Sequence, residues 1–239
     1  SFYRFLFYSL LYQIFGILSL SENEMHDLMW GHYSTDNGFR VKFETDGLVE
    51  SLKTKNGPNL KIFPINYTIQ KLQVDTKRYG VEIPILVDFS TKVKTWSYEK
   101  EWRIIMSKPD MEVPYKIKTP KYPNHEGKDS RLFRFDIKCI KEIVLGMNFF
   151  NGNTLKKSNR ISGNKVQVTV MNEVISNFLD LLIEYIPNNI YQAGIYVDPD
   201  TDDSGTKRIG RSTEAMEIEK IDKLDYVIQR NNPESLSKF

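Results

Sequence analysis

The chain is poor in cysteine and histidine, and this shortage excludes several kinds of site. Among its 239 residues there are one cysteine and three histidines. A single cysteine cannot form an internal disulfide, and low cysteine use is typical of proteins in a reducing compartment such as the cytosol. No Cys or His pair has the spacing of zinc ligands, so we expect no metal site. Cys139 lies in an apolar stretch and is predicted to be a buried, unreactive thiol.

The chain also lacks an excess of charge of one sign. Its 33 basic residues nearly balance 31 acidic residues, so the broad basic surface typical of nucleic-acid-binding proteins is absent. The phosphate-binding loops GxxxxGKS/T and GxGxxG and the nucleophile elbow GxSxG do not occur in it. A hydrophobic content of 40% over this length is enough for a substantial core. The sequence therefore predicts a globular protein whose site is built from scattered residues.

Only one long apolar run is present, at residues 1–21 (SFYRFLFYSLLYQIFGILSLS). Its length would suit a signal peptide or a short membrane span. It contains Arg4, Gln13 and three tyrosines, however, and its last part alternates as a strand does. We therefore expect a strand at residues 14–20 and a cytoplasmic protein that does not enter the membrane.

Periodic segments separated by turns predict an α+β fold: a single domain with a mostly antiparallel, strongly twisted sheet and a few packed helices. We assign residues 1–197 to this domain and residues 198–239 to an acidic loop followed by a charged helix or tail. Ser21 is the expected N-cap of the first helix. The expected helices are 25–33 and 172–186, and the expected strands include 39–44, 49–53, 92–106 and 165–170.

The segment TWSYEKEWR, residues 95–103, contains two closely spaced acids. On an extended strand Glu99 and Glu101 would project to one face, about 6.5–7 Å apart, with Arg103 next to them. Repulsion would raise the pKa of one carboxyl, while Arg103 would lower that of its neighbour. Such a pair suits acid–base chemistry or hydroxyl recognition. An exposed charge ladder at a sheet edge is the alternative, and the spacing alone favours it.

A second candidate is MWGHYS, residues 29–34. On a helix Trp30 and Tyr33 are neighbours, and His32 lies near the C-terminal end, which favours its protonated form. The three residues could form an aromatic surface for a planar ligand, with His32 as hydrogen-bond donor or proton carrier. The alternative is that these side chains form one apolar face of a helix packed in the core, with a single hydrogen-bonded histidine. The general frequency of buried aromatic residues in proteins favours this alternative.

Four segments, in order, resemble blocks of the bacterial family of domains of unknown function DUF2971. They are FYRF at the start, FGILSLSENEMHDLMWGHYSTDNGFRVKFE, WSYEKEWRII and IKCIKEIVLG. The resemblance extends over roughly residues 1–195. Members of the family have a further segment between the first two blocks, so we expect a loop to be missing after the first ten residues. The family itself implies no activity.

A looser resemblance is to the arginine-type ADP-ribosyltransferases, which have an early Tyr-Arg, a serine-rich strand and a late E-x-E. Tyr3-Arg4, Ser19-Leu20-Ser21 and Glu99-Lys100-Glu101 occur here in that order. The resemblance implies that the arginine binds the phosphates of NAD and that a serine positions the arginine and the glutamate. It also implies that the last glutamate binds the nicotinamide ribose and favours an oxocarbenium-like state.

These resemblances lead to one hypothesis and two alternatives. We expect an ADP-ribosyltransferase-like enzyme that uses NAD, a bacterial toxin or phage-defence effector with an unknown acceptor macromolecule, and no metal. The alternatives are a nuclease or RNA-acting effector, with His32, Arg103 and the carboxylates around a phosphate, and a non-catalytic interaction domain. A partner protein or nucleic acid in a defence complex is compatible with each of them.

In the main hypothesis each selected residue has a role. Glu101 is the central carboxylate, and Glu99 tunes it or positions the acceptor. His32 is the third catalytic candidate. The expected NAD-binding residues are Tyr3, Arg4, Ser19, Ser21, Trp30, Tyr33 and Arg103, of which Trp30 and Tyr33, with His32, line the nicotinamide or target side.

Overall fold

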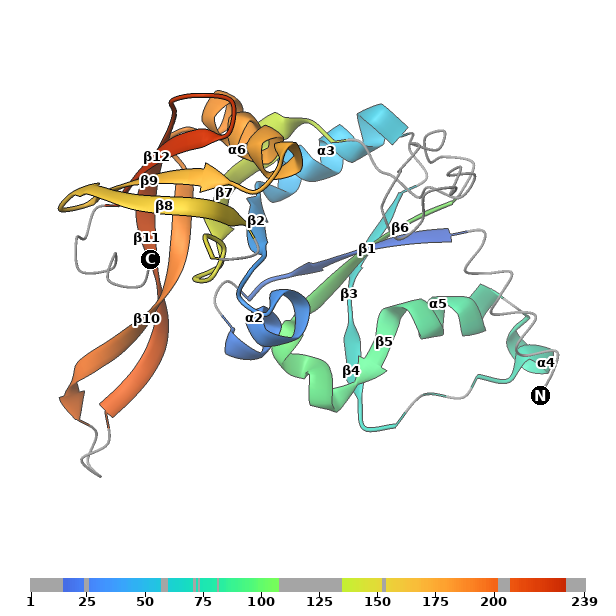
Figure 1. Ribbon diagram of the computed structural model, residues 1–239. Coiled ribbons are helices and arrows are strands. Elements are labelled where there is room, and N and C mark those ends of the chain that lie inside the picture. Colours follow the sequence, from blue (N-terminus) through green and yellow to red (C-terminus); the bar gives the residue numbers. More distant parts are fainter. Residues whose placement is uncertain are drawn as a thin grey trace. The chain divides into compact units, whose positions relative to one another are not determined.

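The computed structural model describes residues 15–23, 26–56, 60–70, 72, 74–80, 82–107, 135–151, 154–201 and 207–230. The chain forms two compact units, and its segments alternate between them (Figure 1). The first unit contains Ser1–Glu24 and Leu48–Asp136, and the second contains Met25–Gly47 and Ile137–Phe239.

The first unit is built on a three-stranded antiparallel sheet with the order β1-β6-β3. These strands are β1, Phe15–Ser21; β6, Glu101–Ser107; and β3, Lys61–Pro64. Strand β6 is central and contributes the most buried side chains of this sheet. One of them, Ile105, packs with Phe89 and with the half-buried Phe15 and Phe63. This apolar cluster joins the sheet to helix α5, Glu82–Ser90.

The remaining elements of the first unit are short. They are α4, Thr76–Tyr79; the parallel pair β4, Asn66–Thr68, and β5, Thr91–Val93; and the 3₁₀ helix η1, Lys94–Glu99. Helix α3, Thr45–Asn56, belongs mostly to this unit. The expected strand at residues 49–53 is therefore wrong. Leu48 and Leu52, one helical turn apart, are both buried, so they supply the apolar face of a helix.

The second unit contains a seven-stranded sheet with the order β2-β7-β10-β11-β12-β9-β8, in which only the β7–β10 pair is parallel. Its strands are β2, Phe39–Phe43; β7, Ile140–Leu145; β8, Leu155–Ser162; β9, Lys165–Val170; β10, Ile190–Thr201; β11, Lys207–Lys220; and β12, Asp225–Arg230. A short 3₁₀ helix, η3, Ile137–Cys139, precedes β7.

Helix α6, Glu173–Tyr185, packs against this sheet through Leu179 and Leu182, which join the apolar core of the second unit. Figure 1 shows α6 beside strands β9 and β12. The side chain of Asn172 caps the helix by accepting hydrogen bonds from two backbone N–H groups of its first turn. Helix α2, Asp27–Ser34, also belongs to this unit.

Several expectations are confirmed. The α+β class, the mostly antiparallel strands, the helix at 172–186 and the burial of Cys139 agree with the structure. Two are wrong. Ser21 ends β1 and does not cap α2, and the charged segment after residue 206 forms β11 and β12 where a helix or tail was expected. No helix in the described part of the chain is long and apolar enough to cross a membrane.

Candidate functional site

Glu99 and Glu101 lie on either side of a tight turn in the first unit. Glu99 is the last residue of η1, Lys100 adopts a left-handed conformation with φ 44°, and Glu101 begins β6. The expectation that both acids project from one extended strand is therefore wrong. A lysine rarely adopts positive φ, because its Cβ crowds the backbone there, so neighbouring groups must hold this turn.

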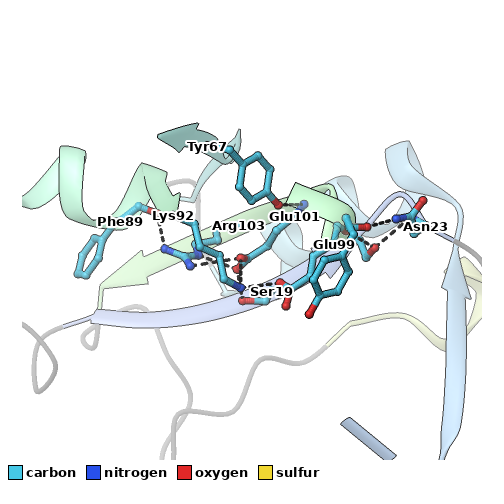
Figure 2. A network of polar contacts seen from close by, with 10 residues as sticks. Ser19, Asn23, Tyr67, Phe89, Lys92, Glu99, Glu101 and Arg103 are labelled. Carbon is cyan, nitrogen blue, oxygen red and sulfur yellow. Dashed lines mark hydrogen bonds and ion pairs between the residues drawn. The ribbon is translucent and has the colours of Figure 1, made fainter. Parts of the chain in front are cut away.

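Lys92 brings the two carboxylates together in spite of the turn. Its ammonium nitrogen lies 2.5 Å from Oε2 of Glu99 and 3.0 Å from Oε2 of Glu101 (Figure 2). The two glutamates are 3% and 5% exposed, so this is a buried ionic cluster and not an exposed charge ladder. The Lys92 nitrogen also lies 5.1 Å from the centre of the Trp96 ring. Lys92 was not among the residues selected from the sequence.

Three side chains donate hydrogen bonds to Glu101. Its Oε1 accepts from the Ser19 hydroxyl at 2.8 Å and from Nε of Arg103 at 2.7 Å. Its Oε2 accepts from Lys92 and, at 3.3 Å, from Nη2 of Arg103. Arg103 is itself fixed, because its Nη1 donates to the carbonyl of Phe89 at 2.8 Å. Figure 2 shows these donors around the carboxylate.

The charges of the cluster stabilise one another. Burial alone would raise the pKa of Glu101, but the hydrogen bonds from Arg103, Ser19 and Lys92 outweigh it and hold that pKa below its ordinary value. Burial alone would lower the pKa of Lys92, and its bonds to Glu99 and Glu101 raise it instead. Glu101 is therefore a carboxylate at neutral pH, and Lys92 is an ammonium ion.

The backbone of the acidic turn is held from two sides. The hydroxyl of Ser21 donates to the carbonyl of Glu99 at 2.5 Å. On the other side, the amide of Glu101 donates to the hydroxyl of Tyr67 at 2.8 Å. The pairing of β1 with β6 explains why serines of the SLS segment reach this turn, since Ser21 lies opposite Glu101 in the ladder.

The aromatic candidates lie on α2 in the second unit. Trp30 is 6% exposed and packs in a core cluster with Val144 and Ala193, which is the alternative that the sequence left open. Tyr33 is 65% exposed, and His32 is exposed as well. Trp30, His32 and Tyr33 belong to the second unit, and Glu101 belongs to the first. A shared site thus stays a prediction.

An arginine that the sequence did not indicate anchors α2. Arg211 of β11 donates to the carboxylates of Asp27 and Asp36, at 2.5 Å for the contact between its Nη1 and Oδ1 of Asp36. Its guanidinium carbon lies 5.8 Å from the centre of the Trp30 ring. These contacts hold α2 against β11 and place the guanidinium near the Trp30 ring, which helps to bury this side chain.

Two of the selected residues, Tyr3 and Arg4, lie outside the described residues. Within the described ranges, no group of three or more His, Cys, Asp or Glu side chains is arranged to hold a metal ion. Of the residues expected around NAD, the structure brings together Ser19, Ser21, Glu99, Glu101 and Arg103.

The fold and this cluster define an α+β protein with a buried carboxylate site between neighbouring strands of a small antiparallel sheet. Residues 29–104 match the model of a family described as protein of unknown function (DUF2971). The match begins within α2 and ends within β6, and over these residues it confirms the resemblance to this family that the sequence indicated. No curated protein and no solved structure matches the chain.

Proposed function

We propose that the first unit contains the catalytic carboxylate of an NAD-using enzyme that resembles the arginine-type ADP-ribosyltransferases. The observation that carries this proposal is the hydrogen bond of 2.8 Å from the Ser19 hydroxyl to Oε1 of Glu101. The resemblance implies that a serine of the serine-rich strand positions the last glutamate of E-x-E. Ser19 and Glu101 make that contact across neighbouring strands, 82 residues apart in the chain.

The charge state of Glu101 suits the reaction. When the bond between nicotinamide and ribose breaks, its electron pair leaves with nicotinamide, and positive charge develops on the ribose. A fixed carboxylate stabilises that charge without rearranging at the moment of reaction. The acceptor nucleophile then bonds to the ribose carbon and loses a proton. We assign Glu101 to stabilisation of the charge and Glu99 to the acceptor and its proton.

Glu101 must release one of its present partners before it can bind a ribose hydroxyl. Arg103 has a planar, fixed guanidinium that is also held by the Phe89 carbonyl, whereas Lys92 carries its three N–H donors on a flexible stem and can leave Oε2 of Glu101 while it stays bonded to Glu99. Lys92 is also the more exposed of the two, at 22% against 16%. We therefore assign Lys92 as the group that the ribose hydroxyl displaces from Oε2.

The wider context of the proposal follows the same resemblance. The enzyme would act as a bacterial toxin or phage-defence effector in the cytoplasm, with a macromolecular acceptor. The sequence assigned His32 and Tyr33 to the nicotinamide or target side, and both side chains are exposed on α2 of the second unit.

The test is NAD binding and nicotinamide release by the whole chain. We expect millimolar NAD to raise the melting temperature and free nicotinamide to accumulate. Glu101→Gln should abolish release, and Ser19→Ala should reduce it. Glu50→Gln, the same change at an exposed position of α3, should behave as the wild type. If the wild-type chain shows neither a thermal shift nor nicotinamide release, the proposal is wrong and the cluster is a structural ion network.

A further inference from the structure

We propose that Ser21, Glu22 and Asn23 form a positioning clamp that holds the acidic turn so that Glu99 meets Lys92 beside Glu101. The acidic turn is residues 98–101. These clamp residues directly follow the part of β1 that carries Ser19. The catalytic consequence of the clamp rests on the proposed function, whereas its effect on the geometry of Glu99 does not.

The clamp binds three consecutive carbonyl groups of the turn. The side-chain amide of Asn23 donates to the carbonyl of Tyr98 (Figure 2). The hydroxyl of Ser21 donates to the next carbonyl, that of Glu99, at 2.5 Å. The backbone amide of Glu22 donates to the third carbonyl, that of Lys100, at 3.2 Å. Each clamp residue thus serves one carbonyl of the turn.

Two further hydrogen bonds tie the clamp together. The Ser21 hydroxyl accepts from the backbone amide of Asn23 at 3.0 Å, so this oxygen also fixes the backbone from which the Asn23 side chain extends. Oε1 of Glu22 accepts from the indole nitrogen of Trp102 at 2.6 Å, which connects the clamp to β6. The three residues therefore bind the turn through its first three carbonyl groups and through Trp102, which follows its last residue.

The clamp explains how a lysine occupies the left-handed position in the turn. Lys100 has φ 44°, a conformation that is unfavourable for a residue with a side chain, and its neighbours must compensate. Without the carbonyl contacts, the strain at Lys100 favours relaxation of residues 98–100 to ordinary backbone angles, against the remaining bonds from Lys92 to Glu99 and from the Glu101 amide to Tyr67. Such a relaxation would carry Glu99 away from Lys92, while Glu101 would stay fixed in the β1–β6 ladder.

We class the clamp residues as positioning residues, because the hydrogen bonds that define the clamp go to backbone carbonyl groups of the turn. They act on Glu99 through its backbone. In the proposed reaction, loss of the clamp should therefore lower kcat, for which Glu99 must be in place, and leave KM for NAD nearly unchanged.

The experiment measures how reactive the Lys92 amine is in the full-length chain. An acylating reagent modifies only the neutral amine, so the rate at Lys92, followed by mass spectrometry, rises about tenfold for each unit by which its pKa falls. We expect faster acylation in Ser21→Ala and in Asn23→Ala, because Glu99 leaves Lys92. Ser21→Thr keeps the hydroxyl and should restore the slow rate.

Controls separate this result from a general loss of structure. Ser34→Ala also removes a serine-to-carbonyl hydrogen bond, in α2, and should leave the Lys92 rate unchanged. The indole N–H signal of Trp102 in an NMR spectrum reports whether the contact with Glu22 persists. If Ser21→Ala does not fold, Asn23→Ala, which keeps the serine, decides the question.

Two outcomes distinguish the proposals. If Lys92 reacts at the wild-type rate in both alanine variants, the clamp does not position Glu99 and the inference is overturned. If the wild-type chain does not turn over NAD but Lys92 becomes reactive in both variants, the proposed function fails and the clamp stands.

Discussion

Replacing Glu101 with glutamine should destabilise the first unit by more than an ordinary surface change does. The substitution keeps the shape of the side chain and one oxygen for Ser19, but it removes the negative charge between Lys92 and Arg103. Breaking a buried ion pair by removing one partner costs about 3–5 kcal/mol. The Lys92 and Arg103 side chains are 22% and 16% exposed, so water solvates them in part. We therefore expect a loss of about 2–3 kcal/mol.

Urea unfolding followed by tryptophan fluorescence measures this loss. Trp96 and Trp102 lie in the first unit and Trp30 lies in the second, so the background for all variants should carry Trp30→Phe. Glu50→Gln in the same background is the matched control, and it should change the free energy of unfolding by less than about 0.5 kcal/mol. If Glu101→Gln and the control lose equal stability, Glu101 does not hold the cluster together and the reasoning is refuted.

Two further predictions use pH and a glycine. Because the pKa of Glu101 is lowered in the folded state, this group contributes stability above the ordinary glutamate value of 4.5, and the contribution is lost as pH falls through the folded-state value. Urea midpoints measured between pH 7 and pH 3 should therefore fall more steeply in the wild type than in Glu101→Gln. Equal slopes would contradict this prediction. In Gly146→Ala the new Cβ would overlap the carbonyl of Asp36, so the second unit should lose about 1–3 kcal/mol of unfolding free energy in the same assay. Gly163→Ala is the control and should be nearly neutral, because the space around Gly163 is open. Equal effects of the two changes would show that the chain around Gly146 can move aside.

Much of the fold follows from local patterns. The helix at 172–186 has a capping asparagine, an apolar face and a following proline, so its bounds could be predicted closely. Strand β9 alternates between buried valines and partly exposed polar residues, which is a typical period-two pattern. Strand β11 carried the same kind of signal: Met216 and Ile218 alternate with glutamates, and both are buried. We misassigned it because its charged composition resembles that of a solvated helix.

The site was harder to predict, because its geometry depends on contacts between distant segments. The order of the serines and glutamates indicated that Ser19 and Glu101 belong together, and they are hydrogen-bonded. The left-handed Lys100 left no local signal, because glycine is the residue that normally marks such a turn. Lys92 was also missed, because the sequence contains many lysines and only the fold places this one between two acids.

The partners of Glu101 lead to a prediction about the order of binding. A ribose hydroxyl can bind Oε2 of Glu101 only if Lys92 leaves, so the lysine competes with NAD in the proposed reaction. Lys92→Met removes the competitor and should lower KM for NAD, whereas Lys53→Met, at an exposed position of α3, should not. The same variant leaves Glu99 and Glu101 without their shared cation, so repulsion should raise the pKa of one of them and move the acidic limb of the kcat profile to higher pH. An unchanged KM would show that Lys92 stays in place when NAD binds, and the substrate would then have to reach the ribose-binding carboxylate by another route.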